Sequence, residues 1–286
     1  MTLPVARMIN TAIHVIQDEG PMGLVRAVVR NLYRFFPFLR RTPQGLHGTN
    51  PPEEIDVVYR VLRADDRRGT MIDVGAHYGG SLAPFARSGW QVYAFEPDAK
   101  NRERLERGYG GMSNVKIDPR GIADEPGVAR PLYRSGESSG ISGLSAFHPT
   151  HVQSETVEVT TLRLFMESQG LEEVDFLKID TEGFDLFVLK GFPWGKTEPR
   201  LILCEFEDRK TLPLGYGFHD MTRFLEERGY RLIISEWHPI QRYGTPHDWR
   251  RFALYPCELA DSRAWGNIFA AKEPLYSALE AACDLN

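Results

Sequence analysis

Short apolar runs alternate with amphipathic stretches along most of the chain after about residue 55. The runs are rich in Val, Ile, Leu and aromatic residues, which favour β-strands, and the stretches between them have helical spacing. Near-continuous apolar strands that alternate with helices are typical of a parallel sheet covered on both faces. We therefore predict a doubly wound α/β domain with right-handed connections. Its strands are predicted at 70–74, 90–96, 114–117, 174–180, 200–207, 230–237 and 266–272, and its helices at 80–88, 98–107, 184–190 and 219–228.

The first 50 residues have a different pattern. Apolar residues recur at helical spacing in 22–36 with arginines between them, which predicts a basic amphipathic helix. Such a helix could cap the main domain, pack against a second subunit or contact a membrane surface peripherally. The Pro and Gly content of 41–54 indicates a linker. We expect a helical extension and linker at 1–50 and one main domain at 51–286.

One segment interrupts the alternation of strands and helices. Residues 136–151, "GESSGISGLSAFHPTH", have the composition of a loop, and the strand-like "TVEVTT" (156–161) follows them. A long insert in a compact domain is usually functional or mobile. Because Ile141, Leu144 and Phe147 give this insert apolar side chains to bury, we predict a lid over a substrate or cofactor, with a disordered surface loop as the alternative.

The composition is that of an ordinary globular protein, with 42% apolar residues, 26% charged residues and a net charge of −5. A mildly acidic chain lacks the basic face of a nucleic-acid binder, so we predict no nucleic-acid partner. Cys204, Cys257 and Cys283 are too scattered to suggest a zinc site or a disulfide framework, which favours a reducing compartment. Because no apolar run approaches about 20 residues and no signal-peptide pattern occurs, we expect a cytoplasmic protein.

The stretch "MIDVGAHYGG" (71–80) joins an apolar strand to a helix through a glycine-spaced turn. In an open parallel sheet, ligands bind beyond the carboxyl ends of the strands. A dinucleotide site would need G-x-G-x-x-G, which leaves room for a pyrophosphate at the helix N-terminus. Here the spacing is Gly75-x-x-x-Gly79, and the carboxylate of Asp73 would repel a pyrophosphate. A ligand with a positive charge and no phosphate suits this turn better.

S-adenosylmethionine has that chemistry, because it joins an adenosine to an amino acid and carries an ammonium and a sulfonium group. Asp73 could hold the ammonium directly or through water. Glu96 follows Asp73 by 23 residues, at the end of "VYAFE", where an acid accepts hydrogen bonds from both ribose hydroxyls. We expect His77 near the carboxylate of the cofactor and Asp98 as the N-cap of the next helix. The two acids together predict a site for S-adenosylmethionine.

A third group of polar residues occurs in "FLKIDTEGFDLFVLKG" (176–191), where an apolar run leads into Lys178, Asp180 and Glu182. This segment is predicted to be the fourth strand of the parallel core, next to the first strand, and its tip would face the methyl group of the cofactor. A catalytic role for Asp180 follows from that position. The alternative is that Lys178 and Glu182 form a solvated pair and that Asp180 caps the next helix.

These stretches together resemble the FkbM family of S-adenosylmethionine-dependent methyltransferases. The signs of that family are a DVGA-x-x-G loop, an AFEP strand end, a T-L helix start and an L-K-I-D-x-E-G segment, and all of them occur here in order between about 70 and 207. Arg163 departs from the pattern, because the family usually has an acid there. The specific matches are Asp73, Gly75, Gly79, Glu96, Pro97, Lys178, Asp180, Glu182 and Gly183.

The resemblance implies a Rossmann-like, seven-stranded methyltransferase fold whose last strand is antiparallel, and hence a methyltransferase domain at 51–286. It also implies O-methylation, commonly of sugar hydroxyls in glycolipids, polysaccharides and glycosylated natural products, or of polyketide hydroxyls. The segment "SEWHPIQRYGTPHDWRRF" (235–252) is similar to a subgroup associated with glycan gene clusters, which favours a sugar acceptor. The residues expected to bind the cofactor are Asp73, Gly75, His77, Tyr78, Gly79, Glu96, Pro97 and Asp180.

Methyl transfer from a sulfonium to an oxygen is an in-line displacement, so the enzyme must align the hydroxyl with the S–CH₃ bond and exclude water. A sugar hydroxyl is a weak nucleophile while it keeps its proton, so a base or a metal must assist. Asp180 and His238 are the candidate bases, and His238 follows the end of a predicted strand. Lys178, Glu182 and Glu205 are further catalytic candidates.

A metal and a set of aromatic residues also enter the predicted site. Asp180 and Glu205 could hold Mg²⁺ through their carboxylate oxygens, although we do not expect the reaction to require a metal. Trp237, Tyr243 and Trp249 could stack on the apolar face of a sugar, and core packing is the equal alternative.

Two other function classes compete with this hypothesis. An NAD-dependent oxidoreductase would need a different loop after the first strand. An interaction module with a methyltransferase fold and no turnover would show a broken equivalent of Asp73 or Glu96, and both acids are present. Nucleic-acid methylation is disfavoured, because the chain has no [DN]-P-P-[YF] segment to hold a flipped base. Methylation of a polyketide hydroxyl or another non-sugar small molecule stays open, as does a homo-oligomeric state.

Overall fold

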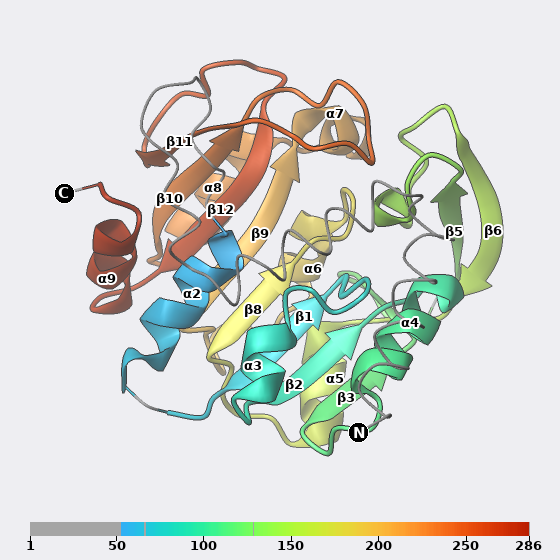
Figure 1. Cartoon of the computed structure of the whole chain (residues 1–286), viewed down its shortest axis with the longest axis horizontal. Coiled ribbons are helices and arrows are strands. Elements are labelled where there is room, and N and C mark those ends of the chain that lie inside the picture. The colour runs from blue at the N-terminus through green and yellow to red at the C-terminus, as the bar shows by residue number, and fades with distance from the viewer. Residues whose placement is uncertain (1–52, 66, 128, 286) are drawn as a thin grey trace, which may run out of the picture. The chain divides into compact units, whose positions relative to one another are not determined.

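The computed structural model of the chain describes residues 53–285, with the exception of residues 66 and 128 (Figure 1). The predicted extension at 1–50, with its basic helix at 22–36, lies outside the described residues. Most of the predicted linker at 41–54 lies outside them as well. The predicted domain at 51–286 falls almost entirely within them.

The described part of the chain forms an α/β fold around an eight-stranded sheet of order β11-β10-β12-β9-β8-β1-β2-β3. All seven predicted strands are present in this sheet, within one or two residues of their predicted bounds. The strands are β1 (Thr70–Val74), β2 (Gln91–Phe95), β3 (Val115–Asp118), β8 (Phe176–Ile179), β9 (Leu201–Glu207), β10 (Arg231–Trp237), β11 (Trp249–Leu254) and β12 (Trp265–Ala271).

The strand directions follow the predicted Rossmann-like pattern. Strands β3, β2, β1, β8 and β9 are parallel to one another, and β12 inserts between β9 and β10 antiparallel to both. The seventh predicted strand is therefore antiparallel, as expected. The sheet has one strand more than predicted, because β11 pairs antiparallel with the outer edge of β10. Its sequence, "WRRFAL", carries two arginines that pair with Glu236 of β10, so its hydrophobic pattern is weak.

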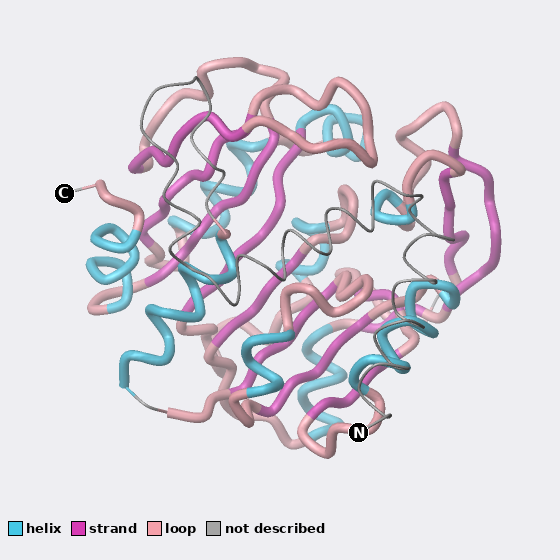
Figure 2. Tube along the Cα trace, viewed as in Figure 1, coloured by secondary structure: helices cyan, strands magenta, loops and turns pink. Residues whose placement is uncertain are grey.

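Helices cover both faces of the sheet (Figure 2). On one face, the helices pack over Met71, Val92 and Phe176. On the other face, they pack over Ile72, Leu177 and Ile202. The first face carries α2 (Glu54–Leu62), α3 (Ala83–Arg87), α4 (Ala99–Tyr109) and α9 (Leu275–Ala282), and the second carries α5 (Leu162–Gln169), α6 (Asp185–Lys190) and α8 (Phe218–Glu226).

The predicted helices are all present, and two of them begin where the sequence places a capping or turn residue. Asp98 caps α4, because its side chain accepts hydrogen bonds from the backbone N–H groups of Lys100 and Asn101. Helix α6 follows the turn at Gly183. The sequence did not predict α2 and α9, which pack against each other beside the sheet.

Smaller elements complete the described chain. A hairpin of two antiparallel strands stands apart from the main sheet and carries the segment that was predicted to be a lid (Figure 1). The remaining elements are β4 (Gly121–Ile122), β5 (Arg130–Ser135), β6 (His151–Val157), β7 (Val159–Thr160), α7 (Asp208–Thr211), η2 (Arg63–Asp65), η3 (Ser139–Ile141) and η4 (Leu212–Leu214).

Strand alternation places the charged residues of the core strands on one face of the sheet. Side chains alternate between the two faces along a strand. Met71, Phe176 and Leu203 pack on the α2 and α3 face, so the residues two positions later, Asp73, Lys178 and Glu205, point to that same face at the carboxyl end. The pairing register sets Asp73 directly beside Lys178. The polar residues of separate strands therefore converge above the helices of this face.

Glu54, the first residue of helix α2, connects this helix to the sheet at the edge where the parallel strands end. The carboxylate of Glu54 accepts hydrogen bonds from the indole N–H of Trp237 at 3.1 Å and from the side-chain amide of Asn267 at 2.7 Å. Burial raises the pKa of Glu54 to about 7, although these hydrogen bonds oppose the shift. One side chain thus joins the first described helix to β10 and β12.

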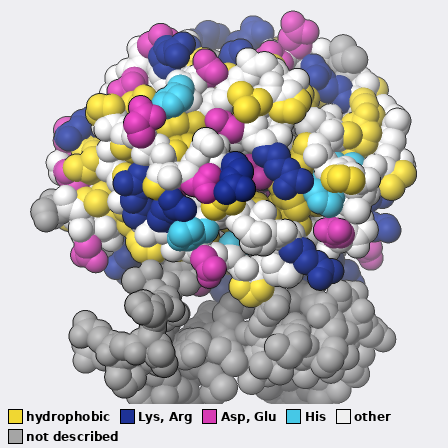
Figure 3. Space-filling model, turned by 90° about the horizontal axis from the view of Figure 1, so that it is seen from above, with side chains coloured by type: hydrophobic (Ala, Val, Ile, Leu, Met, Phe, Trp, Pro, Cys, Tyr) yellow, Lys and Arg dark blue, Asp and Glu magenta, His cyan; other side chains and the backbone are white. Residues whose placement is uncertain are grey.

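Among the described residues, no helix combines the length and the apolar character that a membrane crossing requires. The face shown in Figure 3 carries Lys and Arg side chains interspersed with Asp and Glu, so charges of both signs share this part of the surface. This mixture differs from the continuous basic face that nucleic-acid binders present.

Candidate active site

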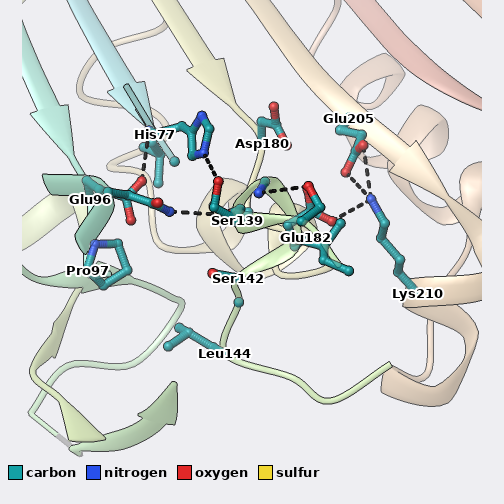
Figure 4. A pocket seen from close by; sticks show the side chains of 18 of the residues that line it. His77, Glu96, Pro97, Ser139, Ser142, Leu144, Asp180, Glu182, Glu205 and Lys210 are labelled. Atoms are coloured by element: carbon teal, nitrogen blue, oxygen red, sulfur yellow. Dashed lines mark hydrogen bonds and ion pairs between the residues drawn. The ribbon is translucent and has the colours of Figure 1, made fainter. Parts of the chain in front are cut away.

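A cavity of about 300 Å³ lies at the carboxyl ends of β1, β2, β8 and β9, where an open parallel sheet binds its ligands (Figure 4). The structure brings seven of the predicted site residues to its wall, and the other five lie outside it. The lining residues among the predicted ones are Gly75, His77, Glu96, Pro97, Asp180, Glu182 and Glu205. Those that do not line it are Asp73, Tyr78, Gly79, Lys178 and His238.

The turn after β1 requires glycine at position 75. Gly75 has a φ of +79°, and a Cβ atom there would lie 1.8 Å from the backbone oxygen of Asp180. Its N–H donates to the carbonyl of Phe95 on β2. The turn is thus wedged between the ends of two neighbouring strands, and a side chain at Gly75 would push those ends apart.

Glu96 stands at the end of β2 with both carboxylate oxygens already oriented. The backbone N–H of His77 donates to Oε2 at 2.8 Å, and the backbone N–H of Asp98 donates to Oε1 at 2.9 Å. Each oxygen keeps a second lone pair that can accept another hydrogen bond. Burial raises the pKa of Glu96 to about 7. Glu96 is therefore a preorganised acceptor of two hydrogen bonds, beside the ring of Pro97, which also lines the cavity.

His77 connects the β1 turn to the predicted lid. Its backbone is left-handed, with a φ of +49°, and its ring Nε2 lies 3.1 Å from Oγ of Ser139. The hydroxyl of Tyr78 reaches the same serine oxygen at 2.7 Å, and the side chain of Asn101 donates to the Ser139 carbonyl at 3.1 Å. Burial lowers the pKa of His77 to about 4, so its ring is neutral near pH 7.

The predicted lid segment at 136–151 lies over the cavity. Residues 138–144 line it, and the side chain of Ile141 is buried, as its apolar character suggested. The ring of His151 contacts the Ile141 carbonyl at 2.9 Å, which connects this segment to β6. Farther along, the ring of Phe147 lies 6.0 Å from that of Tyr243, so the segment also contacts the loop after β10.

Asp73 and Lys178 form a buried pair beneath the cavity. Asp73 is 0% exposed, accepts a hydrogen bond from the Ser81 hydroxyl at 2.5 Å, and lies 3.5 Å from Nζ of Lys178. Burial raises the pKa of Asp73, although Lys178 opposes the shift. Nζ of Lys178 also donates to the Gly75 carbonyl at 3.1 Å. Asp73 thus holds the ammonium of Lys178 and, through it, the turn that lines the cavity.

Asp180 reaches into the cavity at the end of β8. Its side chain is 41% exposed, and Oδ2 lies 3.3 Å from Nζ of Lys178. Burial alone would raise the pKa of Asp180, but the charge of Lys178 outweighs it and holds that pKa below its usual value. The structure therefore presents a charged carboxylate to whatever occupies the middle of the cavity.

A buried lysine that the sequence analysis did not single out lies at the far end of the cavity. Lys210 of α7 is 2% exposed, and its Nζ lies 2.7 Å from Glu182 and 2.9 Å from Glu205 (Figure 4). The same Nζ lies 3.1 Å from Glu207. Burial raises the pKa of Glu182 to about 7 and that of Glu205 well above its usual value, because one ammonium does not neutralise three carboxylates. We call this group, Lys210 with Glu182, Glu205 and Glu207, the lysine cluster.

The predicted magnesium ligands lie close together, but they already face a cation. Carboxylate oxygens of Asp180, Glu182 and Glu205 lie within 4.8 Å of one another. Both oxygens of Glu205 accept hydrogen bonds from Lys210, at 3.0 and 2.9 Å, and Glu182 forms an ion pair with it. A divalent cation would have to displace the ammonium, so these residues fit a metal poorly.

Aromatic and imidazole side chains close the cavity near the lysine cluster. Tyr243, predicted as a stacking residue, lines the cavity, and its hydroxyl donates to Glu207 at 3.2 Å. His247 and Trp265 also line it, with ring centroids 5.2 Å apart, and neither was predicted. Trp265 opens an antiparallel strand and His247 lies in a loop, so only the three-dimensional pairing brings them to the site.

Three predicted residues of the 235–252 segment face other surroundings. The ring of His238 lies 3.0 Å from the guanidinium of Arg250 on β11, outside the cavity. Trp237 donates to Glu54, and Trp249 donates to the hydroxyl of Ser235 at 3.2 Å. Of the aromatic residues that were candidates for stacking, Tyr243 alone lines the cavity, and the two tryptophans take part in packing.

Comparisons with known proteins agree with the sequence resemblance. Residues 73–232 match the profile of the family described as Methyltransferase FkbM domain. The 2-O-methyltransferase NoeI from Sinorhizobium fredii is 24% identical over 189 residues, which make up 60% of this chain and 76% of that protein.

Solved methyltransferase structures are similar to the chain at low sequence identity. A precorrin-6Y C5,15-methyltransferase from Geobacter metallireducens is 13% identical, with a TM-score of 0.40, and the match covers 80% of this chain and 92% of that one. An rRNA methylase from Streptococcus thermophilus is 11% identical, with a TM-score of 0.42, and the match covers 80% and 99%.

Proposed function

Because the chain belongs to the FkbM methyltransferase family, we propose that it transfers the methyl group of S-adenosylmethionine to a hydroxyl of a sugar or glycoconjugate. The observation that carries the proposal is the carboxylate of Glu96, which two backbone N–H groups hold at the cavity wall with one free lone pair on each oxygen. The two neighbouring hydroxyls of a ribose match this pair of acceptors.

The order of groups along the cavity supports a direction for the cofactor. Its nucleoside end would lie at Glu96, between Pro97 and the lid residue Leu144. Its sulfonium and methyl group would lie near the ionised carboxylate of Asp180, which attracts positive charge. Asp73 then acts indirectly, by holding Lys178 and the β1 turn, and does not contact the methionine ammonium itself.

The acceptor would occupy the end of the cavity near the lysine cluster. This end has carboxylates that can accept hydrogen bonds from hydroxyls, and the rings of Tyr243 and Trp265 that can lie against an apolar sugar face. Oxygen as the methylated atom is supported by the name of the relative, a 2-O-methyltransferase. A sugar acceptor rests on the family resemblance and on these groups. A polyketide hydroxyl is the alternative acceptor.

Methylation by the intact chain tests the proposal directly. Full-length protein would first be titrated with S-adenosylhomocysteine in a calorimeter, and with NAD⁺ as the competing cofactor. Labelled S-adenosylmethionine would then be supplied with a panel of methyl pyranosides and with a phenolic polyketide. We expect the protein to bind S-adenosylhomocysteine and not NAD⁺. We also expect labelled methyl groups in at least one of the pyranosides.

Each outcome of this experiment is informative. Binding of NAD⁺ with no binding of S-adenosylhomocysteine would refute the cofactor. Label in the polyketide and in none of the pyranosides would replace the sugar with the alternative acceptor. Cofactor binding without label in any acceptor would favour an interaction module. The predicted peripheral membrane contact, cytoplasmic location and homo-oligomeric state need separate measurements.

A further inference from the structure

We propose that Glu182 is the general base of the reaction, the group that takes the proton from the acceptor hydroxyl, and that Lys210 positions it. The proposal rests on the function proposed above and adds the residue that activates the acceptor. Glu182 comes two residues after Asp180 at the tip of β8, and in Figure 4 it lies between Glu96 on one side and Lys210 on the other.

The backbone of Glu182 is held in an uncommon conformation. Its φ is +56°, a left-handed value that few residues other than glycine, asparagine and aspartate adopt. Such a conformation is strained and persists only where the surroundings enforce it, and strained residues of this kind cluster at functional sites. With this backbone conformation the residue lines the cavity. A helix cap alone would not need it, since Asp185 already accepts the N–H groups of Thr181 and Gly183.

The lid and Lys210 both contact the side chain of Glu182 and hold it in place. A Cβ atom at Gly143 of the lid would lie 3.1 Å from Cβ of Glu182, so the lid backbone passes directly over it. Nζ of Lys210 holds Oε2 at 2.7 Å. The side chain is 10% exposed, and the cavity supplies that exposure. The ion pair thus anchors Oε2, and in this proposal Oε1 receives the proton of a hydroxyl in the cavity.

The other acids of the cavity are less suited to take a proton. Asp180 is paired with Lys178, which holds its pKa below the usual value and makes it a weak base. Both oxygens of Glu205 accept hydrogen bonds from Lys210. Glu207 does not line the cavity, and both of its oxygens accept from the hydroxyl of Tyr243.

The two histidines of the cavity wall are less suited as well. The ring of His77 is bound to Ser139, and its pKa is about 4. His247 packs edge-on against Trp265, and burial lowers its pKa. Glu182 is therefore the group on the described cavity wall that combines access to the acceptor with a suitable basicity.

Burial and the charged groups of neighbouring elements determine the pKa of Glu182. Burial and the negative charges of Asp180 and Glu207 raise its pKa, while Lys210 lowers it, and the result is a pKa of about 7. Glu205 adds a further carboxyl that contacts the same ammonium. A base with a pKa near the working pH is the most effective, because it is partly ionised and still holds the proton that it receives.

The proton and the electrons balance without another reactant. The acceptor oxygen forms a bond to the methyl carbon while the sulfur–carbon bond breaks, and the bonding pair stays on sulfur, which becomes a neutral thioether. The acceptor O–H proton passes to Glu182. The proton then leaves to solvent when the products depart, so one positive charge exits as H⁺.

The test compares Glu182→Gln with Glu207→Gln in the full chain. Both glutamates contact the same ammonium, but only Glu182 lines the cavity. With the best acceptor of the pyranoside panel, we expect Glu182→Gln to lower kcat by about 100-fold or more. It should keep the affinity for S-adenosylhomocysteine within twofold, and it should lose the rise of kcat with pH that we expect of wild type around pH 7. Because the charge of Glu207 raises the pKa of Glu182, Glu207→Gln should lower the midpoint of that pH profile but keep the rise of kcat with pH. Glu167→Gln, a substitution of an exposed glutamate on α5 that does not line the cavity, is the control that should match wild type in kcat and pH profile.

A second measurement needs neither an acceptor nor a folded glutamine variant. In full-length protein labelled with [5-¹³C]glutamate and saturated with S-adenosylhomocysteine, the Glu182 carbon is assigned by its loss in Glu182→Asp. We expect its resonance to titrate between about pH 6 and 8, as the pKa of about 7 requires. A midpoint below pH 5, or an active Glu182→Gln enzyme with an unchanged pH profile, overturns the assignment. If the wild-type protein does not bind S-adenosylhomocysteine, the proposed function itself is refuted.

Discussion

The backbone N–H of His77 lies 2.8 Å from Oε2 of Glu96, which joins the turn after β1 to the end of β2. The glycine-spaced turn and the acid 23 residues later therefore form one unit in the fold. The turn makes room for a ligand, and it also orients the Glu96 carboxylate that would bind the ligand. This relationship leads to the first two predictions.

Glu96→Gln should weaken cofactor binding while the fold is retained. Glutamine keeps the shape of the side chain but loses the charge and one of the two acceptor oxygens. A hydrogen bond to a charged group contributes about 1.5–3 kcal/mol, so we expect the Kd for S-adenosylhomocysteine to rise by about 10-fold to 100-fold. Calorimetry at pH 8 measures it, with Glu172→Gln, a substitution of an exposed glutamate in the loop before β8, as the surface control. An unchanged Kd would show that Glu96 does not contact the ribose.

Cofactor affinity should fall below neutral pH through the same residue. The pKa of Glu96 in the free protein is about 7. In the proposed complex the ribose hydroxyls would donate to its ionised form. Binding therefore favours the deprotonated state, and protonation at lower pH competes with it. We expect the Kd for S-adenosylhomocysteine to rise by up to about tenfold per pH unit below pH 7. In Glu96→Gln this dependence should be smaller, and an equally steep dependence there would assign it to another group.

Lys210→Met should destabilise the protein strongly, and more at high pH than at low pH. The substitution removes the one ammonium that faces Glu182, Glu205 and Glu207. Removal of one partner from a buried ion pair costs about 3–5 kcal/mol. Folding raises the pKa of Glu182 and Glu205 above the ordinary value, so the folded state binds more protons and gains stability as the pH falls.

Urea unfolding at pH 6 and pH 8 measures this effect. The loss of free energy of unfolding in Lys210→Met should be larger at pH 8. Lys196→Met is the matched control, because Lys196 forms an exposed pair with Glu167, and its loss should cost less than about 1 kcal/mol. Equal costs for the two variants would mean that the lysine cluster does not contribute to stability.

Gly75→Ala should disrupt both folding and the site. A Cβ atom would lie 1.8 Å from the Asp180 carbonyl, at a φ of +79°. We expect a loss of roughly 3 kcal/mol or more in the free energy of unfolding, with weaker binding of S-adenosylhomocysteine. Gly80→Ala is the control from the same loop, because a Cβ atom there meets nothing within 4 Å. If both variants have the wild-type urea midpoint of unfolding, the close approach of Gly75 to the Asp180 carbonyl would be contradicted.

The sequence predicted the sheet, and it predicted that charged residues gather at the carboxyl ends of its strands, for physical reasons. Buried parallel strands are almost continuously apolar, so a charge within them stands out, as Asp73 and Lys178 do. Alternation along β8 and β9 also explains why Lys178, Asp180 and Glu205 share a face. These features depend on residues that are near one another in the chain, or on strands whose order the fold class specifies.

The end of the cavity near the lysine cluster was harder to predict, because it depends on contacts between distant segments. Lys210 lies in a helix of four residues, and its ion pairs to Glu182 and Glu205 require β8 and β9 to be adjacent. Trp265 reaches the cavity because β12 runs antiparallel. His238 does follow a strand end, as predicted, but the unpredicted strand β11 supplies Arg250, which holds its ring elsewhere. These contacts join segments that are far apart in the chain, so no local sequence pattern predicts them.

The bond network of Glu54 has a practical consequence for anyone who expresses this domain by itself. Glu54 joins Trp237 and Asn267, and all three positions fall outside the stretch 73–232 that matches the family profile. A fragment trimmed to the profile would also lose the strands β10, β11 and β12 in whole or in part, and with them one edge of the sheet. A shortened version must therefore begin before Glu54 and extend past Cys283 if it is to keep its helical flank intact.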